Sequence, residues 1–290
     1  MMKTVVFGGC GSERFAKLLA KRIKASYAPV RTSYFPDGEL LLRLPADVRG
    51  KHAVLVYSFQ PYPGEVLLEA LIAIGAAKQQ GAKKVTLVAP YLGFMRQDKQ
   101  FHAGEAVSNS IVARLLSSAD MLVTMDPHLH RIKSLNRIFS TKTTTLTANQ
   151  TLADHLRRNH SDKMVVGPDE ESSQWAASVA KLAGLPSIVL KKKRYTATKV
   201  RIIVKSKIPL KGKHVVIVDD IISTGHTMIE PIKQLKKLGV KSITCIGVHG
   251  VFAGNALQDL KKLAMVETTN TIHNPVARID VTKAFAETLR

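Results

Sequence analysis

The 290 residues are 45% hydrophobic, which is enough for two domains of ordinary size that each bury a core, and no segment has the composition of a disordered region. Lys and Arg number 43 against 22 Asp and Glu, which gives a net charge of +21 at pH 7. Because these basic residues are spread over the whole length, without aromatic interleaving, zinc-finger spacing or a helix-turn-helix pattern, we favour small polyanionic ligands or a charged solvated surface over nucleic acid as a partner.

The N-terminal residues 1–9 contain too few apolar residues for a signal peptide. The longest apolar helix candidate, Val66–Ala77, includes Glu69 and is much shorter than a membrane span. Cys10 and Cys245 show neither metal-binding spacing nor a disulfide framework. We therefore expect a cytoplasmic protein that does not enter a membrane.

A tight turn is predicted at Tyr34–Glu39 by its Pro-Asp-Gly core. The turn brings an aromatic ring, Phe35, next to the carboxylates of Asp37 and Glu39. Taken alone, this composition predicts a β-turn and nothing more.

The sequence contains an internal repeat. Residues 50–57 (GKHAVLVY) match residues 212–219 (GKHVVIVD), and residues 78–88 match residues 236–246 in the same order. Each half therefore predicts a strand, a loop, a helix that ends at a Gly, and a second strand, which is a βαβ unit with parallel strands. We expect a duplicated α/β fold with a mainly parallel sheet flanked by helices in each half. The division is predicted near residues 141–148, which gives domains 1–145 and 146–290.

A dense polar loop follows the predicted buried strand at residues 85–89. Within it, Arg96, Lys99 and His102 can meet phosphate groups, while Gln97 and Asp98 offer orienting hydrogen bonds. A solvated loop without a ligand explains this composition equally well.

The basic stretch 191–194 (KKKR) and the residues that follow it, 195–201, are typical of a solvated, mobile loop or hairpin. Solvated charge is the usual role of such runs.

The most informative segment is residues 215–227 (VVIVDDIISTGHT). Its apolar run predicts a strand buried on both faces, and the apolar spacing from Met228 onward predicts a helix that ends at Gly239. The loop between them lies at a helix N-terminus, where unpaired N–H groups and hydroxyls bind an anion. The paired acids before it suit sugar hydroxyls or a metal. An Asp-rich turn that only caps a helix is the weaker explanation.

The corresponding loop of the first copy, residues 57–65, lacks paired acids and contains two prolines, which have no N–H group. Only the C-terminal half is therefore expected to bind a sugar phosphate. His226 stands next to the loop's Gly, and because a His does not readily take positive φ, its backbone is expected to be helical.

Six motifs in this order resemble the ribose-phosphate diphosphokinase family, also called phosphoribosyl pyrophosphate synthetases: FPDGE, PYLGFMRQDKQFHAGE, DPHLH, VVGPD, KKR and VVIVDDIISTGHT. The resemblance extends from about residue 35 to about residue 250. It implies two duplicated phosphoribosyltransferase-like domains and a reaction in which the diphosphoryl group of MgATP is transferred to the anomeric hydroxyl of ribose 5-phosphate, leaving AMP, for nucleotide biosynthesis.

The resemblance also implies a role for each motif. The ATP-binding residues would be Phe35, Asp37, Gly38, Glu39, Arg96, Gln97, Asp98, Lys99 and His102. The ribose 5-phosphate site would consist of Asp219, Asp220, Ser223, Thr224, Gly225, His226 and Thr227, with Arg194 beside it. Lys192 and Arg194 would be catalytic, with Lys193 as the alternative lysine. In the family the Phe35 turn reaches the ATP site of a neighbouring subunit, so the resemblance implies a homo-oligomer with a shared adenine site.

The family's magnesium positions match His128 and Asp169, so Mg²⁺ is the implied cofactor. A His is an unusual ligand for a hard cation that prefers oxygen, and His130 is the weaker rival. After Asp169 this chain has Glu170 and Glu171 where bacterial relatives usually have glycines, which disfavours anion binding there.

Three other functions are compatible with parts of this pattern. A phosphoribosyltransferase would use the same sugar-phosphate loop without the Phe35 turn or the Arg96 loop. A non-catalytic regulatory relative would keep the fold and lose the catalytic residues. An RNA-binding regulator on the same fold would use the positive charge.

Overall fold

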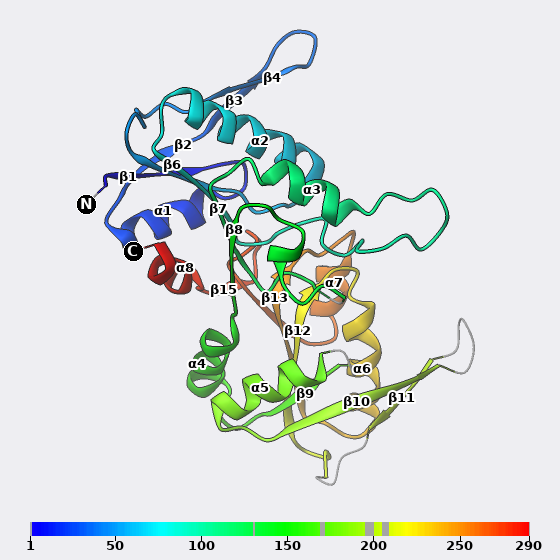
Figure 1. The fold of residues 1–290 in the computed structure, drawn as a ribbon. Coiled ribbons are helices and arrows are strands. Elements are labelled where there is room, and N and C mark those ends of the chain that lie inside the picture. The colour runs from blue at the N-terminus through cyan, green and yellow to red at the C-terminus, as the bar shows by residue number, and fades with distance from the viewer. Residues whose placement is uncertain (1, 130, 169–171, 195–199, 205–208, 290) are drawn as a thin grey trace. The chain divides into compact units, whose positions relative to one another are not determined.

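A parallel sheet forms the centre of each of two units in the computed structural model (Figure 1). The structure describes the backbone of residues 2–129, 131–168, 172–194, 200–204 and 209–289, and the side chains within these ranges except 173–174, 191–194 and 200–204. Unit 1 comprises Met1–Thr147, Thr271–His273 and Val281–Arg290, and unit 2 comprises Ala148–Asn270 and Asn274–Asp280.

Unit 1 contains a six-stranded sheet in the order β2-β1-β5-β6-β7-β8, in which every neighbouring pair is parallel. The strands are β1 (Thr4–Gly8), β2 (Ser26–Pro29), β5 (His52–Val56), β6 (Lys84–Ala89), β7 (Met121–Met125) and β8 (Lys142–Leu146). The helices are α1 (Glu13–Ile23), α2 (Pro63–Gln79), α3 (Ser108–Leu116), α8 (Thr282–Leu289) and the short 3-10 helix η1 (Leu135–Arg137). A separate antiparallel hairpin is formed by β3 (Arg31–Tyr34) and β4 (Leu40–Arg43).

Unit 2 contains a seven-stranded sheet in the order β11-β10-β9-β12-β13-β14-β15. The strands are β9 (Met164–Gly167), β10 (Ser187–Arg194), β11 (Val200–Val204), β12 (His214–Ile222), β13 (Ser242–Gly250), β14 (Met265–Thr269) and β15 (Ala277–Ile279). The helices are α4 (Asn149–Asn159), α5 (Ser173–Ala183), α6 (His226–Lys237) and α7 (Ala256–Lys261). The pair β10–β11 is antiparallel, and the other pairs are parallel.

The duplication predicted from the sequence is confirmed by these sheets. The repeated segments form β5-α2-β6 in unit 1 and β12-α6-β13 in unit 2, and both pairs of strands lie at the centre of their sheets. All five residues of β5 are buried, and Val215–Val218 of β12 are fully buried, because central strands of a parallel sheet are covered on both faces. The expected fold class, two α/β domains with mainly parallel sheets, is therefore confirmed.

The first break between the two units falls between Thr147 and Ala148, within the range predicted for the division. Residues 141–148 also contain β8, a strand of the unit 1 sheet that the sequence did not predict, because half-exposed Thr residues with β-branched side chains suit an edge strand. The end of the chain, which the sequence assigned to the C-terminal domain, belongs to unit 1. There α8 contacts α1: the Phe285 ring is fully buried and meets Phe15 edge-on at 5.2 Å, and Nε of Arg22 donates to Oγ1 of Thr282 at 2.7 Å.

The described part of the chain has no helix of sufficient length and apolar character to cross a membrane.

Candidate active site

The loop predicted to bind a sugar phosphate lies between β12 and α6 in unit 2. The strand ends at Ile222 and the helix begins at His226, so the loop proper is three residues long. Ile222 and Met228 on either side belong to the buried core, each 1% exposed. The loop is therefore fixed at both ends at the carboxyl edge of a parallel sheet, the edge at which open α/β sheets bind ligands.

Gly225 forms the N-cap of α6 with φ 80° and ψ −10°, a left-handed conformation that favours glycine. His226 is the first helical residue and does not have positive φ, so the prediction of a helical backbone there is confirmed. The carbonyl of Gly225 accepts the N–H groups of Met228 and Ile229. In the described residues, no acceptor is found for the N–H groups of the four residues Thr224, Gly225, His226 and Thr227.

These consecutive donors make the loop suitable for an anion. Unpaired N–H groups at a helix N-terminus carry the positive end of the helix dipole. The hydroxyls of Ser223, Thr224 and Thr227 can add further donors, and Nδ1 of His226 lies 3.0 Å from Oγ1 of Thr224. The loop thus offers an anion several backbone and side-chain donors within five residues.

Asp219 and Asp220 lie within β12, before the loop. Asp219 is 6% exposed and Asp220 is half-buried. The N–H of Asp220 donates to Oδ1 of Asp219 at 3.1 Å, and the N–H of Ile221 donates to Oδ1 of Asp220 at 2.7 Å, so each carboxylate is oriented by the next amide. Burial, with a smaller contribution from the Asp219 charge, raises the pKa of the Cys245 thiol to about 12, which leaves it protonated and unreactive.

The matching loop of unit 1 has a broken row of donors. The N–H groups of residues 57–60, which match the end of β12, are bonded within the protein: Tyr57 to Val88 O at 2.9 Å, Ser58 to Ser12 Oγ at 2.8 Å, Phe59 to Tyr91 O at 3.0 Å and Gln60 to Ser58 O at 2.7 Å. Residues 62–65 match 224–227, and Pro63, the first residue of α2, stands at the position of Gly225 and has no N–H. The two copies therefore share their fold and differ in the continuity of the donors in this loop.

The polar loop of unit 1 follows β6 and leads into α3. Its predicted phosphate-binding side chains, Arg96, Lys99 and His102, are all exposed, and Nζ of Lys99 lies 5.3 Å from the centroid of the Phe101 ring. Gln97 is half-buried and accepts a hydrogen bond from Oγ of Ser108 at 3.1 Å.

Glu105, which the sequence did not single out, holds this loop together. Its carboxylate accepts the N–H of Phe101 at 2.9 Å and Nε2 of Gln97 at 3.4 Å, and its carbonyl accepts Nε2 of Gln100 at 2.7 Å. The loop is therefore held by hydrogen bonds between its own residues.

Asp98 binds an arginine of the following motif. Nη1 of Arg131 donates to Oδ1 of Asp98 at 2.7 Å, and the N–H of Arg131 donates to Oδ2 at 3.3 Å. Burial pushes the pKa of Asp98 upward, but the hydrogen bonds and charge of Arg131 outweigh it, so the pKa lies below its usual value. This ion pair joins the segment after β7 to the polar loop, and sequence reasoning missed it because the two residues are 33 positions apart.

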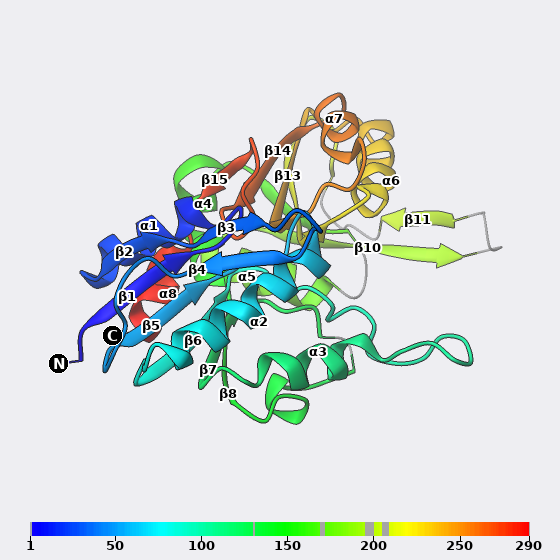
Figure 2. The same ribbon diagram turned by 90° about the horizontal axis from the view of Figure 1, so that it is seen from above.

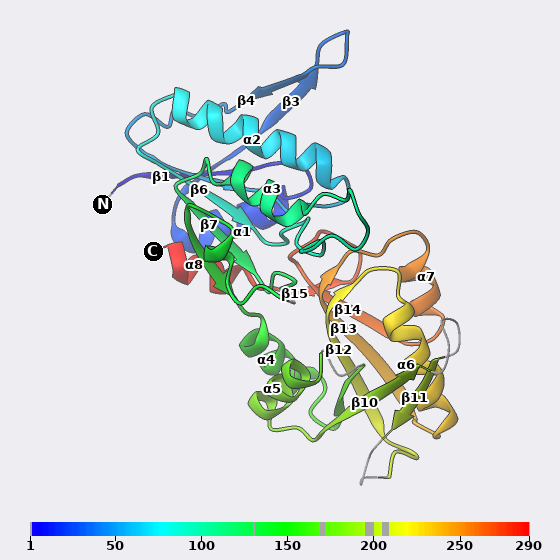
Figure 3. The ribbon, with the colours of Figure 1, turned by 45° about the vertical axis from the view of Figure 1, so that its right-hand side comes forward.

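The turn at residues 34–39 forms the tip of the β3–β4 hairpin. The N–H of Phe35 donates to Glu39 O at 2.9 Å, the N–H of Gly38 donates to Phe35 O at 2.9 Å, and Gly38 takes φ 92°. Tyr34 and Phe35 are 66% and 48% exposed. The tip lies apart from the polar loop of the same unit in all three views (Figures 1, 2 and 3).

Backbone strain occurs in the segments that follow three parallel strands. Phe94 after β6, Asp126 after β7 and Phe252 after β13 have φ of 65°, 35° and 48°. Such conformations cost about 1–3 kcal/mol each and are concentrated at functional sites. His128, two residues beyond Asp126, is half-buried. Its predicted metal partner Asp169 and the rival His130 lie outside the described residues, as do Glu170 and Glu171.

The basic stretch continues β10. Lys192 is paired with Ile202 and Arg194 with Val200 in the antiparallel β10–β11 ribbon (Figure 2). The hairpin that the composition allowed is therefore present, while the side chains of residues 191–194 lie outside the described residues.

Comparison with protein-family models matches residues 4–119 to the N-terminal domain of ribose phosphate pyrophosphokinase and residues 137–282 to the phosphoribosyl transferase domain. The ribose-phosphate pyrophosphokinase of Methanopyrus kandleri is 34% identical over 279 residues, 94% of this chain and 94% of that protein. The ribose-phosphate pyrophosphokinase of Pyrococcus furiosus is 34% identical over 260 residues, 89% of this chain and 91% of that protein. A crystal structure of phosphoribosylpyrophosphate synthetase from Mycobacterium smegmatis has a TM-score of 0.85 at 28% identity, and the match covers 99% of this chain and 98% of that one.

Proposed function

The chain belongs to the ribose-phosphate pyrophosphokinase family, and we propose from this that it transfers the diphosphoryl group of ATP to the anomeric hydroxyl of ribose 5-phosphate. The anomeric oxygen attacks the β-phosphorus, the bond between the α- and β-phosphates breaks, and AMP leaves. The hydroxyl proton is released. The products are 5-phosphoribosyl 1-diphosphate and AMP. Two polyanions must be brought together, so positioning and charge neutralisation supply most of the catalysis.

The observation that carries this proposal is the unbroken row of unpaired N–H groups at residues 224–227, which is interrupted by Pro63 at the matching position of unit 1. We assign the 5-phosphate of the sugar to this loop. Asp219 and Asp220 precede it by a few residues on β12 and would accept hydrogen bonds from the ribose hydroxyls. A carboxylate repels a phosphate and attracts a hydroxyl, so the order of the residues along the strand orients the sugar.

We assign the nucleotide to the polar loop of unit 1. Exposed Arg96, Lys99 and His102 can meet the ATP phosphates, and Gln97, oriented by Ser108, can bind the nucleotide. Asp98 would act by holding Arg131 in place, since its carboxylate is bonded to that guanidinium.

The Phe35 turn supports a homo-oligomer. Its aromatic and carboxylate side chains are exposed at the end of a hairpin, and the tip lies apart from the polar loop of its own unit (Figure 3). A turn in this position can contribute to a nucleotide site on a second copy of the chain. We propose that Phe35 stacks on adenine there, with Gly38 allowing the turn and Asp37 and Glu39 accepting from the amino group.

The donor set around His128 fits a magnesium ion bound through the nucleotide. When bound, Mg²⁺ neutralises phosphate charge and polarises the transferred group. A hard cation prefers oxygen, and Asp126 places a carboxylate two residues from His128 at the same carboxyl end of β7. We propose that His128 and Asp169 hold the ion, with Asp126 beside them.

Lys192 and Arg194 are proposed to neutralise the charge that develops on the transferred group and on the leaving AMP. They stand two residues apart on β10.

One incubation separates the candidate functions. The protein is mixed with ATP, Mg²⁺ and ribose 5-phosphate, and AMP and 5-phosphoribosyl 1-diphosphate are quantified. Stoichiometric formation of both is expected. A phosphoribosyltransferase would form neither without a base acceptor, and a non-catalytic relative would leave ATP intact.

A further inference from the structure

A second group of polar side chains lies in unit 2, on the strands of its sheet. Glu267 is the middle residue of β14, Thr244 is the third residue of β13, and Lys163 directly precedes β9. In the register of the sheet, Glu267 pairs with Ile246, which pairs with Val218 of β12, so Glu267 lies one step before the level of Asp219. Because successive residues of a strand face opposite sides, Glu267 and Asp219 lie on opposite faces of the sheet, and the group around Glu267 is separate from the candidate active site.

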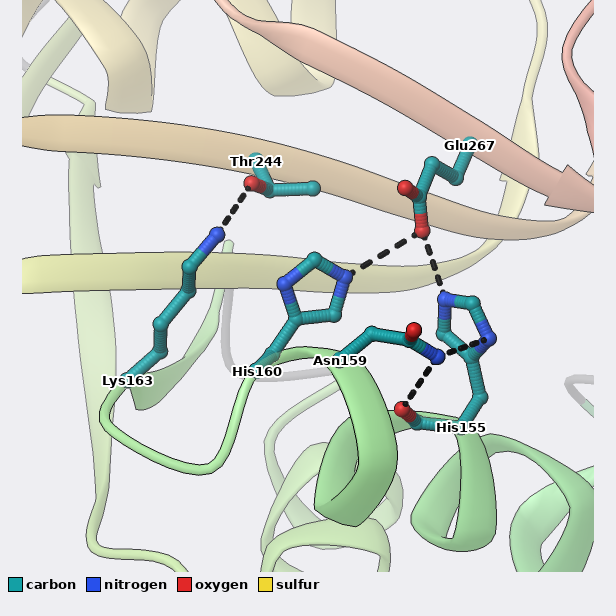
Figure 4. A network of polar contacts seen from close by, with 6 residues as sticks. All are labelled: His155, Asn159, His160, Lys163, Thr244 and Glu267. Carbon is teal, nitrogen blue, oxygen red and sulfur yellow. Dashed lines mark hydrogen bonds and ion pairs between the residues drawn. The ribbon is translucent and has the colours of Figure 1, made fainter.

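Two imidazoles converge on one carboxylate oxygen in this group (Figure 4). Nε2 of His155 lies 2.6 Å from Oε2 of Glu267, and Nε2 of His160 lies 3.2 Å from the same atom. One ligand atom from each of the three residues lies within 4.8 Å of the other two. The side chains are 13%, 5% and 8% exposed for His155, His160 and Glu267, so the cluster is almost enclosed.

The hydrogen bonds of Asn159 define the tautomer of His155. Nδ2 of Asn159 donates to the carbonyl of His155 at 3.1 Å, and the same amide group lies 3.2 Å from Nδ1 of His155. A carbonyl only accepts, so the amide nitrogen faces both atoms and Nδ1 of His155 is an acceptor without a proton. Nε2 then carries the proton and donates it to Glu267.

His160 has no such restraint. Its Nδ1 is buried, and in the described residues it has no hydrogen-bond partner. Moving a proton from Nε2 to Nδ1 of this ring would therefore break no hydrogen bond at Nδ1. The nitrogen that faces Glu267 can become a free electron-pair donor without loss at the other end of the ring.

Glu267 accepts from both imidazoles through the single oxygen Oε2, and donors of this kind stabilise the ionised carboxylate. An ionised carboxylate and neutral imidazoles are the forms in which these side chains bind metal ions.

We propose that His155, His160 and Glu267 form a zinc-binding site. Two imidazole nitrogens and one carboxylate oxygen are a known zinc ligand set, in which a fourth position is left for water. Each imidazole stays neutral, with its proton moved from Nε2 to Nδ1, and zinc takes the place of the two protons that now bridge to Oε2. In His155 this requires the Asn159 amide to turn, so that its oxygen accepts from Nδ1–H where its nitrogen now donates. The rings need to separate from the carboxylate slightly, because ligands on one zinc are farther apart than hydrogen-bonded atoms.

Lys163 opposes the binding of a cation at this position. Its Nζ donates to Oγ1 of Thr244 at 2.9 Å, and its charge interacts with Glu267. Burial lowers the pKa of Lys163, which reduces the cost of losing its charge when a dication binds nearby.

A metal here would join elements that are distant in sequence. His155 is on α4, His160 is its C-cap, and Glu267 is on β14. Binding would tie the end of α4 to the sheet of unit 2 and stabilise that unit by mass action. The site would thus be structural, with no part in the transfer reaction.

To test this, the full chain is treated with a chelator to remove bound metal and is then titrated with zinc in a calorimeter. Excess Mg²⁺ is present, so that sites made mainly of oxygen ligands are already occupied. We expect one zinc per chain, abolished in His155→Gln and in Glu267→Gln and kept in His273→Gln, which changes an exposed histidine. Zinc at 100 times its Kd should raise the melting temperature by about 5–10 °C. Absence of binding, or equal binding in all variants, overturns the proposal.

A second variant does not remove a ligand. In Asn159→Asp, a carboxylate replaces the amide beside Nδ1 of His155, and a carboxylate that accepts from a ligating histidine increases its affinity for metal. We expect the affinity for zinc to rise by about tenfold in this variant. When Co²⁺ is bound in place of zinc, we expect the absorption bands of tetrahedral Co²⁺. Unchanged or weaker affinity would show that His155 is not a ligand.

Discussion

Gly225→Ala tests the sugar-phosphate loop through its backbone alone. Gly225 has φ 80°, and the added Cβ would lie 3.4 Å from its nearest neighbour, Cδ1 of Leu260, which is ordinary contact. The substitution therefore introduces conformational strain without a clash. A residue with a Cβ pays about 1–2 kcal/mol in the left-handed region.

This strain should appear as a loss of sugar affinity. If the loop relaxes to another conformation, the N–H groups of residues 224–227 leave their present positions. Binding of the sugar phosphate must then return the loop to its original conformation, at the cost of the same strain. The same 1–2 kcal/mol then corresponds to about 5- to 30-fold weaker binding of ribose 5-phosphate, since 1.4 kcal/mol is a factor of ten. The KM for ATP should stay unchanged, because ATP is assigned to residues of unit 1.

The assay measures the initial rate of AMP release. Ribose 5-phosphate is varied at saturating MgATP, and MgATP is then varied at saturating ribose 5-phosphate. Gly212→Ala is the matched control: its φ of 75° imposes the same strain, nothing lies within 4 Å of the new Cβ, and Gly212 precedes the amino end of β12. It should lower the melting temperature without changing either KM. The reasoning fails if the KM for ribose 5-phosphate changes less than twofold in Gly225→Ala, or if Gly212→Ala raises it equally.

Five further substitutions test the other assignments. Asp219→Ala or Asp220→Ala should raise the KM for ribose 5-phosphate at least tenfold more than that for ATP, and equal losses in steady-state kinetics would contradict their role at the sugar hydroxyls. Phe35→Ala should weaken ATP binding in calorimetry and shift the oligomer toward smaller species in sedimentation, and unchanged values in both would remove the turn from the nucleotide site. Lys192→Ala should lower kcat by about a hundred- to a thousand-fold with little change in either KM, as expected for a donor that acts mainly in the transition state. Lys193→Ala, at the alternative lysine, should be much milder, and a larger loss there would move the catalytic role to that residue.

The parts of the fold that the sequence predicted are those with a local signal. The buried runs of β5 and β12 and the helices that follow them could be read from apolar periodicity and from the repeat. The strand β8 was missed because its residues are exposed or half-buried, so no apolar run marks it. The place of α8 in unit 1 depends on the contact of Phe285 with Phe15, 270 positions earlier, and no local pattern reports such a contact.

The candidate site divides in the same way. The Gly225 N-cap and the helical His226 follow from the conformational preferences of the two residues, so they could be predicted. The ion pair of Asp98 with Arg131 and the meeting of His155, His160 and Glu267 depend on tertiary structure. The five-residue spacing of the two histidines is not that of one helix face, and His160 reaches Glu267 because it lies at the C-cap, outside the regular helix, with φ −145° and ψ 30°.

The two halves of the chain show that the fold by itself does not determine which copy can bind the sugar phosphate. Both present a loop between a central parallel strand and a helix, at the edge where such sheets bind ligands. In unit 1 the residues that match 224–227 include Pro63, which has no N–H and breaks the row of donors. In unit 2 Gly225 is the N-cap of the helix, no proline interrupts the loop, and four consecutive N–H groups remain unpaired in the described residues. On our proposal the sugar phosphate binds to the continuous row of unit 2 and the nucleotide to unit 1, so that the two copies of one fold would hold two different substrates.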